Sequence, residues 1–286
     1  MLGRRGALRF LAVPPYLWLG LFFVLPLILI IAISFRPETG PIDFDDPWNL
    51  TTAQYKVVLD TPVYIRLLGI SALMALAVAG FATLLAFPIA YFLTFRARER
   101  ATTYLILLLI PFATSYLLRV MAWRLMLGQE GAINSFLEFI GLIGEPLDLL
   151  LYSRAAVVIT LVYVWVPFAT LPIYAAMQRI DRGHLEAAAD LGAGPWSRFR
   201  RITIPLSLPG ALAAFFMVFI PTVGEYVTPS LVGGTEGFMY GNLIQDFFTS
   251  AANWALGSAL SVIMLVATLL FVLVALRVVD LRRVVT

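Results

Sequence analysis

The chain has 286 residues and a net charge of +3; 61% of its residues are hydrophobic and only 13% are charged. This charged fraction is about half of the roughly 25% found in soluble domains, and the mean hydropathy is +0.91, so the composition excludes an ordinary soluble globular protein. With no cysteine and a single histidine, His184, the sequence also excludes a disulfide, a thiolate metal site and a multi-histidine metal site.

Long apolar runs, rather than alternating ten-residue segments, predict an all-α integral membrane protein rather than a barrel. About 20 helical residues cross a bilayer, and six runs are long enough. The predicted spans are Leu11–Phe35, Leu67–Phe95, Thr103–Leu127, Ala155–Met177, Leu208–Val227 and Ala255–Val279. The first run follows three arginines but is too long for the apolar region of a signal peptide, so we expect it to be a retained span.

Basic residues gather in alternate loops. The N-terminal segment, the loops after the second and fourth spans, and the C-terminal tail hold 14 of the 20 basic residues. The other loops hold 12 of the 17 acidic residues. The positive-inside rule then predicts that both termini and the loop after the fourth span are cytoplasmic, which an even number of spans satisfies.

The longest polar interruption is Glu186–Pro205, with the sequence EAAADLGAGPWSRFRRITIP, between the fourth and fifth spans. Its first residues favour a helix, and Gly192 is expected to end or bend that helix. The rest predicts a turn and a second short amphipathic helix on the membrane surface, with three arginines to keep it in water.

The spacing of this loop, E-A-A, three residues, G, nine residues, I-x-L-P, resembles the signature loop of ABC-importer permease subunits. The matching positions are Glu186, Ala187, Ala188, Gly192, Ile202 and Pro205, with Ile204 where the family usually has leucine. The resemblance implies the type I importer permease fold, with a coupling loop at about 178–207 that docks onto a separate ATP-hydrolysing subunit. It also implies a second homologous permease subunit and an extracytoplasmic substrate-binding protein as partners.

The same resemblance divides the chain into an N-terminal transmembrane helix and outer loop at 1–66, a permease core at 67–279 and a cytoplasmic tail at 280–286. The sequence has no G-x-x-x-x-G-K-[ST] motif, and its only lysine is Lys56. We therefore expect no cofactor on this chain and no enzymatic activity, with ATP and magnesium bound by the partner. No H-E-x-x-H or G-x-S-x-G motif supports a membrane-embedded enzyme, and no inverted repeat supports an ion-coupled secondary transporter.

Three further stretches resemble spermidine/putrescine permeases, in particular the first permease subunit of such importers: Pro111–Asn134, Gly224 to Gly234, and Asn253-Trp254. The resemblance implies import of a small cationic solute across a bacterial inner membrane. Importers for opines, other organic cations, phosphonates or iron share some of these motifs and remain alternatives.

The substrate-path candidates are Glu225, Tyr226, Tyr163 and Trp165. A carboxylate near the membrane is expensive in lipid and would attract a cation, and the aromatic rings could add cation–π contacts. For each residue the alternative is an interfacial side chain with no substrate contact. Tyr91 is a further aromatic candidate. Arg119 and Arg124 are expected to extend toward the interface or to pair with acidic residues.

Overall fold

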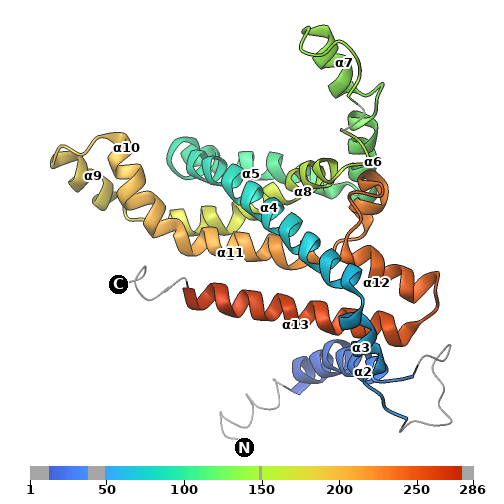
Figure 1. Ribbon diagram of the computed structural model, residues 1–286. Helices are drawn as coiled ribbons and strands as arrows, with labels where there is room; N and C mark the ends of the chain where they lie inside the picture. Colours follow the sequence, from blue (N-terminus) through green and yellow to red (C-terminus); the bar gives the residue numbers. More distant parts are fainter. Residues whose placement is uncertain (1–12, 38–48, 148–149, 279–286) are drawn as a thin grey trace, which may run out of the picture. The chain divides into compact units, whose positions relative to one another are not determined.

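The computed structural model describes residues 13–37, 49–147 and 150–278, and these residues form helices and turns with no β-strand among them (Figure 1). They divide into two compact units. One lies within Met1–Arg66 and Leu243–Ala267, and the other within Leu67–Asn242 and Thr268–Thr286.

The first unit joins the end of the first predicted span to a short helix. The chain is helical over Val13–Ser34, with a π-helical turn at Gly20–Val24 that leads into α2, Leu25–Ser34, and the short helix is α3, Ala53–Asp60. The buried Ser34 hydroxyl lies 2.6 Å from the Tyr55 hydroxyl, and the Phe35 and Tyr55 rings pack at 5.1 Å. These contacts hold α3 against the end of α2.

The remaining helices lie wholly or partly in the second unit. Helix α4 begins in the first unit, α12 ends in the first unit, and α13 begins in the first unit and ends in the second. In chain order they are α4 (Pro62–Phe92), η2 (Leu93–Ala97), η3 (Arg98–Arg100), α5 (Ala101–Leu109), η4 (Ile110–Ala113), α6 (Tyr116–Leu127), α7 (Ala132–Phe139), α8 (Arg154–Gln178), α9 (Arg182–Asp190), α10 (Pro195–Arg198), η5 (Phe199–Thr203), α11 (Ile204–Val223), η6 (Pro229–Gly233), α12 (Tyr240–Thr249) and α13 (Trp254–Val278).

Helices α8 and α11 pack along each other and form the centre of the second unit. The Ser153 side chain caps α8 by accepting a hydrogen bond from the Ala156 N–H at 3.1 Å. Where the two helices meet, a Cβ added to Gly210 would lie 2.4 Å from the Ala176 Cβ and 2.6 Å from the Pro172 carbonyl oxygen. Small residues let membrane helices approach this closely, and the close approach maximises van der Waals contact.

In the part of the chain that the structure describes, five helical stretches are long and apolar enough to cross a membrane: Val13–Ser34, Pro62–Ala113, Arg154–Gln178, Pro195–Val223 and Trp254–Arg277. The second has 52 residues and would measure about 78 Å if straight, more than twice the thickness of a bilayer core. Its backbone turns at Arg98, where φ is +47°. This stretch contains the second predicted span and the beginning of the third, so the count of six spans stays a prediction with which the fold does not conflict.

The fourth and sixth predicted spans agree with α8 and α13, although Val279 lies outside the described residues, as does Leu11 at the start of the first. The third predicted span, 103–127, is divided between two helices. A 3-10 turn at Ile110–Ala113 ends the α5 segment, and α6 begins only at Tyr116. Pro111 has no N–H to continue the α-helical ladder, which explains the break.

The fifth predicted span begins too late and ends too late. A continuous helix starts at Pro195, passes through α10 and η5 into α11, and ends at Val223 rather than Val227. The second short helix expected on the membrane surface is therefore the first turns of this long helix. Proline suits its first position because the missing N–H has no intrahelical partner there.

Candidate functional site

The predicted coupling loop contains a well-capped helix, α9. The Asp181 carboxylate accepts a hydrogen bond from the Gly183 N–H at 2.9 Å and caps the start of the helix. Satisfying one of the free N–H groups at a helix start stabilises it, so Asp181 defines where α9 begins.

The other end of α9 is closed by Gly192, as the sequence predicted. Its φ is +83°, in the left-handed region that favours glycine. The Ala193 N–H donates to the Ala188 carbonyl at 2.9 Å, and the Gly192 N–H donates to the Ala189 carbonyl at 2.8 Å. This pair of bonds is a Schellman C-cap, which turns the chain sharply away from α9 toward α10.

The coupling loop exposes both polar and large apolar side chains. Glu186 and Ala187 are exposed, and Ala188 is half-buried. Leu191 and Trp196 are 89% and 70% exposed, although each is large and apolar. The sequence analysis missed these two residues; the available signal was their position inside an otherwise polar stretch. Together they give the loop an apolar surface of the kind that partner proteins cover.

Two side chains connect the loop to the membrane helices. The Arg198 guanidinium donates to the Leu185 carbonyl of α9 at 3.4 Å, a long hydrogen bond. The Phe199 ring meets the Phe87 and Tyr91 rings of α4 edge-on, with centroids 5.9 and 5.3 Å apart. Displacement of α9 would therefore act on the helix that continues into α11, and through Phe199 on α4.

The remaining signature positions lie in that same continuous helix. Ile202 is half-buried in η5, and Pro205 is exposed near the start of α11. Tyr91, a candidate for cation–π contacts, packs against the coupling loop through Phe199.

Glu225 and Tyr226 lie in the break between α11 and the helical turns that follow. The Glu225 carboxylate accepts hydrogen bonds from the Val227 and Thr228 N–H groups at 3.0 and 3.2 Å. It thereby caps the next helical turn, a structural role that the sequence did not predict. The Tyr116 hydroxyl lies 2.5 Å from the Thr228 hydroxyl, and it also interacts with the Glu225 carboxylate.

A buried amide holds this broken segment together. Asn242 is 3% exposed, and its side-chain nitrogen donates to the Tyr226 carbonyl at 2.8 Å and to the Ser230 hydroxyl at 2.7 Å. Its side-chain oxygen accepts from the Met239 N–H at 3.0 Å. Three hydrogen bonds from one buried side chain fix the irregular backbone, which explains how a segment rich in proline and glycine keeps one conformation.

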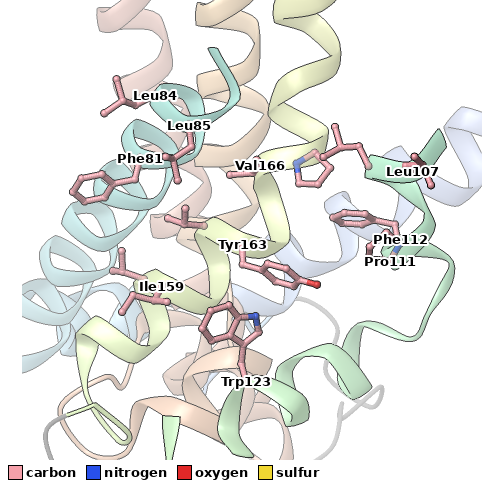
Figure 2. Close-up of a pocket in the computed structure, with 14 residues that line it drawn as sticks. Phe81, Leu84, Leu85, Leu107, Pro111, Phe112, Trp123, Ile159, Tyr163 and Val166 are labelled. Carbon is pink, nitrogen blue, oxygen red and sulfur yellow. The ribbon is translucent and has the colours of Figure 1, made fainter. Parts of the chain in front are cut away.

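Tyr163 lines a different feature, a cavity of about 740 Å³ between α4, α5, α6 and α8 (Figure 2). Its ring lies 5.3 Å from that of Trp123, and Figure 2 shows the two rings together at one end of the cavity. The lining side chains are apolar or aromatic, and neither Glu225 nor Trp165 is among them. Of the four path candidates, only Tyr163 lines this cavity.

Trp165 packs elsewhere on α8. Its ring lies 5.8 Å from Phe168, which meets Phe112 at 4.6 Å, and its buried indole N–H has no partner among the described residues. Arg119 also packs on this aromatic group, with its guanidinium 4.3 Å from the Phe112 centroid. The sequence left two possibilities for Arg119, extension toward the interface or pairing with an acid. Among the described residues no acid pairs with it, and its guanidinium lies on a ring face.

Within residues 13–37, 49–147 and 150–278, no group of three acidic, histidine or cysteine side chains is placed to hold a metal ion. The candidate features are therefore the predicted coupling loop, the Glu225 region and the cavity that Tyr163 lines.

The chain matches the family described as "Binding-protein-dependent transport system inner membrane component" over residues 5–283. It is 34% identical over 259 residues to the Escherichia coli spermidine/putrescine transport system permease protein PotB, covering 90% of this chain and 92% of PotB. It is 28% identical to the inner membrane ABC transporter permease protein YdcU of the same organism, covering 90% and 85%.

Among solved structures, a bacterial ABC transporter involved in the import of the acidic polysaccharide alginate has a similar fold. The TM-score is 0.71 at 17% identity, over 97% of this chain and 96% of that chain. The helical fold agrees with the predicted permease architecture, and the family match spans nearly the whole sequence. The chain therefore belongs to the binding-protein-dependent permease family, the inner-membrane components of ABC importers, and is a transport subunit rather than an enzyme.

Proposed function

We propose that this chain is the first of two permease subunits of an ATP-driven importer for polyamines such as spermidine or putrescine. The observation that supports this most strongly is 34% identity across 90% of the chain to a spermidine/putrescine permease. Titrating the cognate extracytoplasmic binding protein with polyamines in a calorimeter tests the substrate class. Binding of an opine, a phosphonate or iron in place of a polyamine would overturn that part of the proposal.

The proposed mechanism uses two conformational states of the membrane helices. A separate ATPase subunit would cover Glu186 and the exposed Leu191 and Trp196, and its closure would move α9. Because Arg198 and Phe199 connect α9 to α11 and α4, that movement would open the path outward to the binding protein. ATP can shift the equilibrium between the two states of the membrane helices only if the ATPase subunit binds the loop more tightly in one state than in the other.

This proposal requires α9 on the cytoplasmic side. The chain has no cysteine, so Leu191→Cys would carry its only thiol, at a side chain that is 89% exposed. We expect a membrane-impermeant maleimide to label this variant in inside-out vesicles and not in intact spheroplasts, when it is expressed without the ATPase subunit that would cover Leu191. Labelling in intact spheroplasts would contradict the orientation, and labelling after detergent solubilisation controls for access to the thiol.

Glu225→Gln separates the charge of this side chain from its capping role. Glutamine keeps an oxygen that can accept from the Val227 and Thr228 N–H groups but removes the negative charge. If the carboxylate attracts the cationic solute, we expect the KM for uptake to rise roughly tenfold, as the loss of one charge-assisted interaction implies. The thermal stability of the purified chain should change little.

The matched control is Glu236→Gln, which removes a charge from an exposed residue of the same segment. We expect normal uptake from this variant. An unchanged KM for Glu225→Gln would leave Glu225 as a helix cap without a part in transport.

A further inference from the structure

We propose that a polar cavity beside the start of α9 binds the phosphodiester headgroup of an anionic phospholipid. The cavity has a volume of about 700 Å³ and lies between residues 93–101, which follow α4, and residues 174–182, which run from the last turn of α8 to the first residue of α9. Its inner wall includes the buried side chains of Leu93, Met177 and Ile180. This site goes beyond the proposed transport function, because it lies away from Glu225 and does not depend on which solute is carried.

The charges around the cavity favour an anion. Arg98 and Arg182 both line it, one from each segment, and both are exposed. Neither guanidinium has a hydrogen bond or ion pair with any residue that the structure describes. Glu99 also lines the cavity and opposes an anion, so the lining charge is one acid against two arginines. Guanidinium groups match the oxygens of a phosphodiester with two parallel hydrogen bonds, which makes arginine the preferred residue for such a group.

Polar groups beside the two arginines complete the site. The Gln178 amide donates to the Tyr174 hydroxyl at 2.7 Å, and both side chains line the cavity. The backbone of Arg98 has φ +47°, which is uncommon for a residue other than glycine and often marks a functional position. A cationic solute such as a polyamine would be repelled by the arginines, so the cavity is unsuited to the proposed substrate.

Aromatic residues indicate that the cavity lies at the depth of lipid headgroups. Phe92 and Tyr104 meet edge-on at 5.5 Å and are 46% and 39% exposed. They lie next to the lining residue Leu93 and one helical turn beyond the lining residue Ala101. Exposed aromatic side chains gather at the membrane interface, and basic pockets between helices on the cytoplasmic side bind anionic headgroups. A lipid with its headgroup in the cavity could extend its acyl chains over the exposed apolar side chains of α4 and α5.

Native mass spectrometry of the full-length purified chain tests the proposal. The chain would be delipidated in detergent and titrated with phosphatidylglycerol, phosphatidylcholine or soluble glycerol 3-phosphate. We expect one phosphatidylglycerol to bind roughly thirtyfold more tightly than phosphatidylcholine, since each arginine near a membrane surface contributes about a fivefold preference for an anionic lipid. Competition by glycerol 3-phosphate as effective as that by the lipid would identify a soluble phosphate as the ligand and overturn the proposal.

Arg98→Gln combined with Arg182→Gln should abolish this preference. The matched control, Arg100→Gln with Arg179→Gln, removes the same charge from exposed residues of the same two segments that do not line the cavity, and should keep it. Glu99→Gln should tighten phosphatidylglycerol binding severalfold, a gain that misfolding cannot imitate. Equal lipid preference in the Arg98/Arg182 variant and its control, or no gain from Glu99→Gln, would refute the site. Because lipid binding is measured without transport, this outcome is independent of whether the importer carries polyamines.

Discussion

Replacing Gly192 with valine should lower ATP-driven uptake by the assembled importer roughly tenfold or more. A branched residue at φ +83° carries strain of about 1–3 kcal/mol, and the turn after α9 can relieve this strain only by changing its backbone conformation. A Cβ at this position would meet no atom within 4 Å, so the effect comes from the backbone conformation rather than from a clash. The chain should still insert in the membrane. Uptake into vesicles, with immunodetection of the chain in the same membranes, measures both properties.

Two variants control for this interpretation. Gly192→Asn should retain most of the uptake, because asparagine tolerates the left-handed region better than other residues. Gly194→Val changes a glycine of the same loop that also has open space around it but an ordinary φ of −64°, and should transport normally. If Gly192→Val transports as well as Gly194→Val, the shape of the turn does not matter for coupling.

Replacing Gly210 with valine should destabilise the chain by about 3 kcal/mol or more, through overpacking at the crossing of α8 and α11. Even the first added carbon would lie 2.4 Å from the Ala176 Cβ and 2.6 Å from the Pro172 carbonyl oxygen, and backbone atoms cannot move aside as a flexible side chain can. The two helices would have to separate, and the buried contacts along them would be lost. Thermal unfolding of the purified chain in detergent measures the loss.

Gly80→Val is the matched control for Gly210. It also lies inside a long apolar helix, α4, but a Cβ there meets nothing within 4 Å. We expect its unfolding temperature to stay close to that of the unmodified chain. A similar loss in both variants would attribute the effect to valine in a helix rather than to the α8–α11 crossing.

The sequence predicted the parts of the fold that depend on local composition. Apolar runs identified α8 and α13 nearly to the residue, because a membrane span needs a continuous run of apolar side chains. Gly192 was identified as the end of α9 from a local property as well, because few residues other than glycine adopt a positive φ at low cost. The span predicted over 103–127 is divided around Pro111, because the sequence does not show which interior prolines end a helix and which, like Pro167, lie inside a continuous one.

The same limit applies to the candidate site. Glu225 stands out in the sequence as a carboxylate near the membrane, but its hydrogen bonds to the Val227 and Thr228 N–H groups depend on how the chain folds back after α11. Tyr163 and Trp165 are two positions apart on α8, and consecutive side chains on a helix point in different directions, so only Tyr163 reaches the cavity in Figure 2.

By itself, the sequence determined that the chain is a helical membrane protein and that a helix ends at Gly192, because hydrophobicity and the need for glycine at one turn act through residues close together in the chain. The importer permease type followed from the resemblance of Glu186–Pro205 to the signature loop of a family. Only the tertiary structure decided that α10 continues into α11, that Asn242 fixes the broken segment, and that Arg98 and Arg182 border one cavity. The Asn242 contacts and the cavity bring together residues that are far apart in sequence. The continuation of α10 into α11 depends on whether the backbone N–H and C=O groups between them stay in helical hydrogen bonds. Packing and hydrogen bonding in three dimensions decide all of these features.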